Sequence, residues 1–364
     1  MPDLNIDFMN GQAAQGDVAQ FLQTNGKLDP SMMRPYVGAD GKVYVTVFKG
    51  GDAKKKENYK TMHVNTTGTL RRDEWKLLDE ALITIAEHRL QGTQDLINRG
   101  LVFNLGNAMG TTVLEWHDVG DALDADLTMD GITRAQNDRP EYTTHYLPIP
   151  IIHADFEINA RVLAASRNLG NALDTTMVER AGRKVAEKLE KMLFTNTTYS
   201  FGGGTIRSLV NHTSREQMAI GTNWTALSDD STGSVGEKIV AQVLAAKQAS
   251  IENNFYGPWV LYIPTGYETL IDKDYNSYKN NTIRQRILDI AGIQAVAVVD
   301  TLAANNVLLV QTTSDVVRIV RGMGLQTVQW QQEGNMITKF KVMTIQVPQV
   351  RGNPNGKCGI VHIA

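Results

Sequence analysis

Two extended segments on either side of an acidic stretch constrain this 364-residue chain more than any other feature. Residues 101–119 and 142–158 are rich in β-branched and aromatic side chains, which favour strands. Residues 120–140 between them are polar and carry a series of aspartates. This order predicts a long β-hairpin with little of its own to pack against. Because an isolated two-stranded ribbon is marginal in water, we expect a neighbouring molecule or the hairpin's own domain to hold it.

A long amphipathic helix follows the second extended segment. Pro148 and Pro150 favour an edge strand or an extended arm over residues 147–158, because proline cannot donate a hydrogen bond within a central strand. We expect Thr176 and Glu179 to form a capping box near the start of the helix. Apolar residues then recur at spacings of three and four, which predicts one buried face: Val178, Ala181, Val185, Leu189 and Met192. The opposite face is charged: Arg180, Arg183, Lys184, Glu187, Lys188, Glu190 and Lys191.

The chain before the hairpin divides into an arm and a helix. Residues 1–68 are polar and glycine-spotted, with one predicted hairpin at 34–47, and we expect them to gain order by lying on another surface. A helix is predicted from a cap at Thr69 to a stop at Gly92.

The chain after the long helix changes pattern twice. Residues 233–311 alternate between helix and strand, which predicts a compact α/β subdomain with its own core. The tail from 316 to 363 returns to strands, and its alternation predicts a sheet with one solvated face: Phe340, Val342, Thr344 and Gln346. The fold class is therefore α+β.

Composition excludes several classes of protein. A net charge of −3 predicts no strong attraction to nucleic acid or membranes, and no apolar run approaches the length of a membrane span. The N-terminus lacks a signal-peptide pattern. Cys358 is the single cysteine, which excludes an internal disulfide and a multi-thiolate metal site and suits a reducing cytosol.

A search for catalytic, cofactor-binding and metal-binding motifs finds none. The seven histidines show no metal-ligand spacing. His117 beside Asp118, and His153 two residues before Asp155, could form acid–base pairs, but on β-rich arms we interpret them as surface or interface residues. The glycine triplet at 202–204 lacks the lysine and spacing of a phosphate loop. The sequence therefore predicts that this protein is not an enzyme.

The order of these parts resembles the capsid fold of tailed double-stranded DNA phages, the Hong Kong 97-like fold, and especially its encapsulin-related branch. The resemblance covers roughly residues 69 to 363. Short motifs carry it: Trp75, Leu78-Asp79, Ala81, Leu90-Gln91-Gly92, Leu105-Gly106-Asn107, Pro150, Phe156, Leu173-Asp174, Ala181, Arg183-Lys184, Ala186-Glu187, Leu193-Phe194 and the glycine-rich turn before Ile206.

This resemblance implies a division of the chain into four parts. They are an N-terminal arm (1–68), an extended loop (104–148), a peripheral domain (69–103, 149–232 and 312–364) with a spine helix at about 172–195, and an axial domain (233–311). In that family, axial domains meet around five- and six-fold axes, and arms and extended loops lie across neighbouring subunits. A neighbour would then bury the hairpin.

The resemblance also implies the partners. The function is self-assembly of a major capsid protein into pentamers and hexamers that enclose double-stranded DNA, which the shell contacts non-specifically. A scaffolding or decoration protein and a portal are further expected partners, with assembly in the bacterial host cytoplasm, residence in the virion and no membrane. Candidate inter-subunit contacts come from the hairpin, the arm and the spine helix: Trp116, Asp121, Asp124, Asp126, Asp130, Arg139, Lys54, Lys55, Lys56, Arg180, Arg183 and Lys184.

Three departures from the family refine this expectation. The 68-residue arm before the first helix favours a virus capsid over a cargo shell, and it is too short for a typical fused scaffolding domain. From Leu77 to Gly182 there is no lysine, so the extended loop cannot supply the amine for a covalent crosslink between subunits. Two alternatives stay open: an encapsulin-like nanocompartment that packages a cargo enzyme, and a soluble enzyme built on the α/β core at 233–311.

Overall fold

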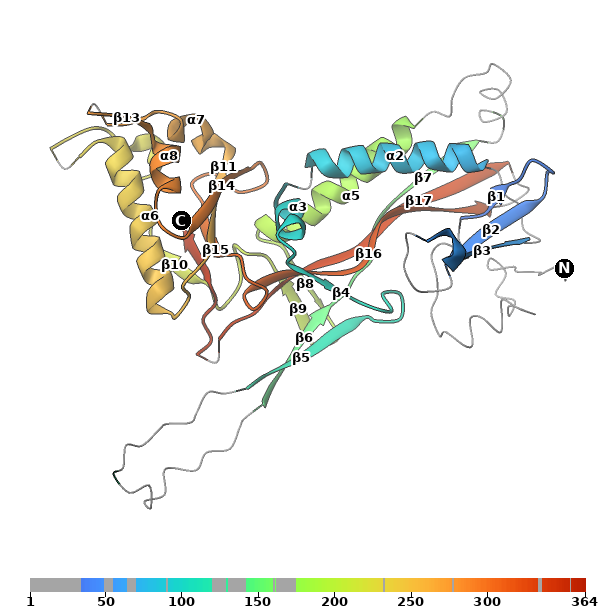
Figure 1. Cartoon of the computed structure of the whole chain (residues 1–364), viewed down its shortest axis with the longest axis horizontal. Helices are drawn as coiled ribbons and strands as arrows, with labels where there is room; N and C mark the ends of the chain where they lie inside the picture. Colours follow the sequence, from blue (N-terminus) through green and yellow to red (C-terminus); the bar gives the residue numbers. More distant parts are fainter. Residues whose placement is uncertain are drawn as a thin grey trace.

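Two β-sheets with helices packed on them make up the body of the protein in a computed structural model (Figure 1). The structure describes residues 34–48, 55–63, 70–89, 91–119, 129, 142–159, 161, 175–231, 233–276, 278–332, 336–353 and 355–364. Their helices and strands form the α+β architecture that the sequence predicts.

The first sheet has four strands in the order β4-β16-β17-β7. They are β4 (Val102–Asn104), β16 (Val317–Gln332), β17 (Ile337–Val350) and β7 (Ile152–Asn159). β7 lies at the edge, as the prolines before it predict. Helices α2 (Arg72–Arg89) and α5 (Thr176–Phe194) lie side by side along this sheet (Figure 1), and their apolar faces share one core with it.

Three local predictions in this region are wrong. Helix α5 begins without a capping box, because the Thr175 hydroxyl donates to the Glu179 carboxylate and no side chain caps a backbone N–H. The first helix ends at Arg89, and Gly92 lies inside the next helix, α3 (Gln91–Asn98), rather than after a stop. Along β17 both alternating sets of side chains are buried from Val342 to Val350, so that part of the strand has no solvated face.

The second sheet is mixed, with five strands in the order β10-β18-β15-β11-β14. They are β10 (Glu216–Met218), β18 (Ile360–Ile363), β15 (Val307–Gln311), β11 (Trp259–Pro264) and β14 (Ile293–Val299). This sheet therefore takes in two strands from outside residues 233–311. Helices α6 (Val235–Glu252) and α8 (Ile283–Leu288) share a core with one of its faces.

Alternate residues of β11 enter two different cores, which explains why the whole strand is buried. Trp259, Leu261 and Ile263 face α6, whereas Val260 and Tyr262 join a core that includes the ends of α3 and α5. The Tyr262 hydroxyl also donates to Asp95 in α3 at 2.9 Å, and burial raises the pKa of Tyr262 well above its usual value. The two sheets are thus joined by a packed, hydrogen-bonded contact.

The described N-terminal segment lies against α2. β1 (Tyr36–Val37), β2 (Val43–Phe48) and β3 (Tyr59–His63) form a three-stranded sheet, so the predicted hairpin at 34–47 is confirmed and gains a third strand. The Trp75 indole donates to the Pro35 carbonyl at 3.1 Å, and Arg34 pairs with Asp79 at 2.7 Å.

The remaining described elements are short and connect these layers. They are η2 (Lys56–Asn58), β5 (Val113–Val119), β6 (Tyr142–Pro148), β8 (Thr198–Phe201), β9 (Gly204–Arg207), η3 (Trp224–Ala226), η4 (Thr265–Tyr267), α7 (Glu268–Ile271), β12 (Asp274–Asn276) and β13 (Lys279–Thr282).

Candidate functional site: the extended hairpin and its base

Strands β5 and β6 form the extended hairpin that the sequence predicts. They pair antiparallel from Val113 opposite Pro148 at the base to Val119 opposite Tyr142 at the far end. The base is anchored, since Leu147 and Ile149 are buried in the core beneath α2 and α5. Tyr142, in contrast, is 66% exposed. The hairpin projects away from both sheets (Figure 1), and Tyr142 marks the end of the part that the structure describes.

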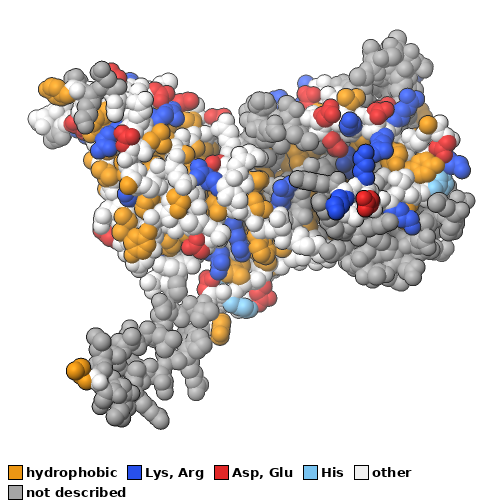
Figure 2. All heavy atoms as spheres, in the orientation of Figure 1, with side chains coloured by type: hydrophobic (Ala, Val, Ile, Leu, Met, Phe, Trp, Pro, Cys, Tyr) orange, Lys and Arg blue, Asp and Glu red, His pale blue; other side chains and the backbone are white. Residues whose placement is uncertain are grey.

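A polar cluster fixes the hairpin where it leaves the body. The rings of Trp116 and His145, which face each other across the two strands, stack with centroids 5.3 Å apart. The Nε2 atom of His145 lies 3.1 Å from one oxygen of Asp118, and Arg351 lies 3.5 Å from the other. Arg351 directly follows β17, so this cluster ties the hairpin to the central sheet. Figure 2 shows basic, acidic and histidine side chains close together at this place.

The glycine triplet at 202–204 has a structural role at the base of the extended hairpin. Gly202 and Gly203 are the two loop residues between β8 and β9, and both have positive φ (58° and 81°), which glycine adopts without strain. At Gly204 a Cβ atom would lie 2.3 Å from the Tyr146 carbonyl oxygen. Glycine therefore lets β9 approach β6 closely, and the β8–β9 hairpin supports the base of the extended hairpin.

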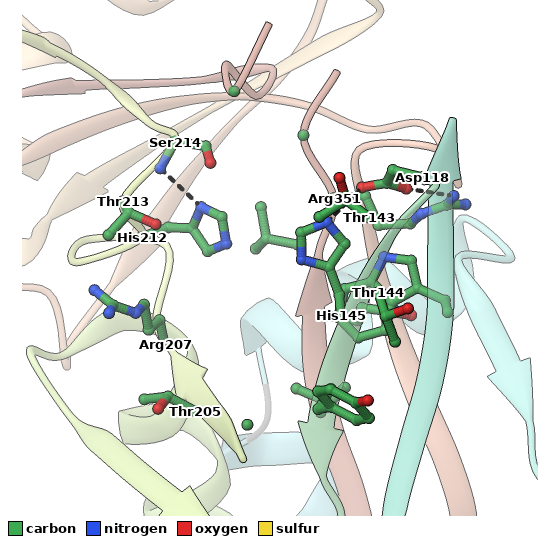
Figure 3. Close-up of a pocket in the computed structure, with 18 of the residues that line it drawn as sticks. Asp118, Thr143, Thr144, His145, Thr205, Arg207, His212, Thr213, Ser214 and Arg351 are labelled. Atoms are coloured by element: carbon green, nitrogen blue, oxygen red, sulfur yellow. Dashed lines mark hydrogen bonds and ion pairs between the residues drawn. The ribbon is translucent and has the colours of Figure 1, made fainter. Parts of the chain in front are cut away.

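A cleft of about 560 Å³ lies between the hairpin and the body, and we call it the hairpin cleft. One wall comes from β5 and β6, and the other from β9, the loop after it, residues 348–353 and Gly356 (Figure 3). His212 on the body wall accepts a hydrogen bond from the Ser214 backbone N–H at 3.3 Å. Burial, together with the charges of Arg207, Arg215 and His145, lowers the pKa of His212 to about 4, so this imidazole is neutral at pH 7.

The predicted contact residues lie on three separate elements where the structure describes them. Trp116 is half-buried in β5, Lys55 and Lys56 are exposed at η2, and the three spine-helix residues Arg180, Arg183 and Lys184 are exposed on α5. The remaining predicted contacts lie outside the described residues: Lys54, Asp121, Asp124, Asp126, Asp130 and Arg139.

Cations of α5 gather on one helical face, which we call the basic stripe: Arg180, Arg183, Lys184, Lys188 and Lys191. All five side chains are exposed. Lys184 pairs with Glu187 at 3.0 Å, and no ion pair joins the other four to a described acidic residue. Like charges one turn apart repel each other, so an anionic surface laid over the stripe would be stabilising.

Of the two histidine–aspartate pairs considered from the sequence, the structure forms one, and the other histidine has a different partner. Asp118 contacts His145 rather than His117, because neighbours along a strand point to opposite faces, and His117 contacts Thr144 instead. His153 and Asp155 do pair, at 3.1 Å, and both are nearly half exposed, which fits a surface pair. Arg207, His212 and Arg351 carry no local signal in the sequence, since the fold alone brings them to one cleft.

The described residues were also compared with the requirements of a metal site, a membrane span and a reactive thiol. They contain no group of three or more His, Cys, Asp or Glu side chains placed to hold a metal ion. None of their helices is both long and apolar enough to cross a membrane. Cys358 is free and buried, and its burial raises the pKa of the thiol to about 12.

Comparison with known proteins identifies the family and the fold. The chain belongs to a family of unknown function (DUF6260), which matches residues 65–363. No curated protein matches the sequence. Among solved structures, the virus-like particle from Pyrococcus furiosus is 17% identical, with a TM-score of 0.56 over 80% of this chain and 99% of that one.

Two capsid structures give similar values. The capsid of Myoviridae phage XM1 is 10% identical, with a TM-score of 0.54 over 73% of this chain and 90% of that one. The capsid of the native GTA particle is 12% identical, with a TM-score of 0.53 over 75% of this chain and 90% of that one. These likenesses confirm the predicted Hong Kong 97-like capsid fold.

Proposed function

We propose that this protein is a major capsid protein that self-assembles into the icosahedral head of a tailed phage. One observation carries the proposal beyond the fold: the extended hairpin is anchored at its base, yet it projects away from both sheets and Tyr142 at its far end is 66% exposed. A two-stranded ribbon of this kind is marginal in water on its own. A neighbouring subunit supplies the missing surface.

The proposed shell is built from pentamers and hexamers. In it, the five-stranded sheet and α6 belong to an axial domain around the symmetry axes, and the four-stranded sheet with α2 and α5 belongs to a peripheral domain. The N-terminal arm and the hairpin reach across to neighbours. The shell encloses double-stranded DNA in the virion, forms in the host cytoplasm, works with a portal and a scaffolding or decoration protein, and catalyses no reaction.

The basic stripe on α5 is the proposed partner of the acidic residues at 121–130 in a neighbouring hairpin. Several exposed cations on one helical face are complementary to an anionic surface, and the hairpin sequence between β5 and β6 contains four aspartates in that range. Lys54, Lys55 and Lys56 provide a second, smaller basic site in the arm.

Charge reversal tests this contact. Changing Arg180 and Lys184 to Glu should prevent assembly or make it more sensitive to salt, whereas Lys55→Glu with Lys56→Glu tests the arm separately. Combining the α5 reversal with Asp121→Lys and Asp124→Lys should restore shells if the two segments touch. Loss of assembly without restoration would refute this pairing, and normal assembly of the α5 variant would show that the stripe has no such role.

An encapsulin-like nanocompartment that packages a cargo enzyme is the alternative function. Its support is the likeness to the virus-like particle of Pyrococcus furiosus, which this chain matches over 99% of that chain's length. Negative-stain microscopy of the purified protein, with the ratio of absorbance at 260 and 280 nm, separates the two. Large shells, or rings that close only with a partner protein, support the phage head, and small uniform shells filled with protein support the nanocompartment. A chain that stays monomeric when concentrated contradicts both.

A further inference from the structure

Strand β8 lies at a sheet edge and exposes two aromatic side chains. Among the described strands it pairs with β9 alone, so its second edge is open there. All four residues of β8 are exposed, and Tyr199 (46%) and Phe201 (53%) are its large apolar side chains. Both rings project from the same face of the strand, because one residue separates them. An edge strand that exposes large apolar side chains favours pairing with another strand.

The pairing of β8 with β9 defines an aromatic face and a polar face. Tyr199 lies opposite Ile206, which is 1% exposed in the core beneath α2 and α5, so the aromatic face extends that core beyond its edge. On the polar face the hydroxyls of Ser200 and Thr205 are 2.8 Å apart, and Arg207 follows on the same face. Neither strand contains an acidic residue. A strand added to β8 therefore fits best if one side is apolar and the other acidic.

Residues 3–8, which lie outside the described residues, have this pattern in their sequence. Their polar and apolar side chains alternate strictly, as is typical of a half-buried strand: Asp3, Leu4, Asn5, Ile6, Asp7 and Phe8. The apolar set suits the aromatic face of β8, since pairs of aromatic and β-branched side chains on neighbouring strands stabilise a sheet. The two aspartates of the polar set complement the charge of Arg207.

The chain between this segment and the body is long enough to reach β8. Arg34 pairs with Asp79 on α2, and α2 runs beside α5 to the place where Glu190 contacts Gly92. β8 follows the end of α5, so roughly one helix length separates it from Arg34, about 28 Å for the 19 residues of α5. Residues 9–33 form the connection, and a random coil of about 25 residues has an r.m.s. end-to-end distance of about 25–30 Å. This match gives the segment a high effective concentration at β8 of its own chain.

We propose that residues 3–8 add to the open edge of β8 of the same chain as a further strand, with their apolar side chains on its aromatic face. Main-chain hydrogen bonds to the edge provide affinity, and the alternating side chains provide specificity. The inference does not depend on the proposed shell, because it describes one unassembled chain. If assembly moves the arm to a neighbour, the same contact is exchanged between subunits.

Hydrogen exchange of the Ser200 amide, measured by NMR on the unassembled full-length protein, tests the proposal. Gly202 and Gly203 both have positive φ, as in a two-residue type I′ hairpin, whose closing pair, here Phe201 and Gly204, is hydrogen-bonded. The alternation of an antiparallel ladder then directs the Ser200 N–H to the open edge of β8. An added strand should protect this amide from exchange in the wild type.

Two variants with the same new charge separate the two faces of the added strand. Ile6→Asp places a carboxylate on the apolar side and should speed exchange of the Ser200 amide by about tenfold or more, because the charge opposes burial beside the aromatic rings. Asn5→Asp is the matched control, since it places the carboxylate on the polar side and should leave the exchange rate unchanged. An unprotected Ser200 amide in the wild type, or equal rates in the two variants, would overturn the proposal.

A disulfide identifies the molecule that supplies the segment. Ile6→Cys combined with Tyr199→Cys should form a bond within one chain in the presence of a mild oxidant, because cross-strand neighbours on one face bring their Cβ atoms within reach. Asn5→Cys combined with Tyr199→Cys puts the thiols on opposite faces and should form far less. The native Cys358 is buried and does not compete. A disulfide found only between two chains would overturn the assignment to the same molecule, and equal oxidation of the two pairs would overturn the assignment of faces.

Discussion

Replacement of Glu190 by alanine should destabilise the protein through helix α3. The sequence places Glu190 on the charged face of α5, but this expectation is wrong, because only 4% of its surface is exposed. Its carboxylate is buried where it accepts three hydrogen bonds at the start of α3. The Gly92 N–H is 2.9 Å from one oxygen, and the N–H and hydroxyl of Thr93 are each 3.4 Å from the other. Removal of the carboxylate leaves these buried donors without a partner.

The expected cost follows from those contacts. One well-formed bond to a buried N–H is lost, at ~1–3 kcal/mol, and the two long contacts of Thr93 add little. Alanine also removes a carboxylate whose burial raises its pKa, which offsets part of the loss. We therefore expect Glu190→Ala to lower the free energy of unfolding by about 1–2 kcal/mol in urea titrations of the unassembled chain at fixed concentration. Glu190→Gln keeps an acceptor for Gly92 and should cost less.

The pH dependence supplies a sharper test. Because the folded pKa of Glu190 is raised above its unfolded value, protonation stabilises the fold. The wild type should gain stability relative to Glu190→Gln below the unfolded pKa of ~4.5 and lose that gain as pH rises through the raised folded value. A Glu190→Ala protein within ~0.5 kcal/mol of the wild type, or a difference from Glu190→Gln that does not change with pH, would refute the reasoning.

Three further predictions concern other parts of the chain. Gly92→Ala places a Cβ atom 2.1 Å from the Phe194 ring and should lower the free energy of unfolding by ~1–3 kcal/mol; an unchanged urea midpoint would contradict this. Cys358, with a pKa of about 12, should react with a thiol reagent at pH 8 far more slowly in the native protein than in urea, and equal rates would show that the thiol is accessible. Shells should dissociate to monomers in SDS, since residues 77–182 contain no lysine; a ladder of covalent oligomers would refute this.

The local patterns of the sequence predict most of the fold. Two β-rich segments around an acidic stretch predict the hairpin, and the spacing of Val178, Val185 and Leu189 predicts the buried face of α5. These predictions succeed because strand alternation and helical periodicity act over a few residues.

Long-range contacts explain where the sequence misleads. Gly322 and Gly324 suggest a break between two strands, but β16 runs through both for 16 residues, with irregular register between Arg321 and Gln326 where a β-bulge is accommodated. Gly92 suggests a helix end, but its role is to leave room for Phe194. At Gly322 and Gly92 an added Cβ atom would meet another element, Ala108 and Ile345 in the first case and Phe194 in the second, so no local pattern contains the reason for these glycines.

The hairpin cleft is the part of the site that the sequence could not predict. Trp116 and His145 are brought together by strand pairing, whereas Arg207 and Arg351 come from β9 and from the residue after β17. Only the three-dimensional fold places these side chains around one cavity. The predicted basic residues of α5, in contrast, are exposed on one helical face as the periodicity requires.

A cryo-electron microscopy map of assembled particles tests the central claim most directly, because it shows which surface covers the far end of the β5–β6 hairpin. The proposed function predicts closed icosahedral shells in which that end lies on a neighbouring subunit and the acidic residues at 121–130 meet its basic stripe. Protein that forms no particles at any concentration, or particles in which each hairpin folds back on its own subunit, would contradict it.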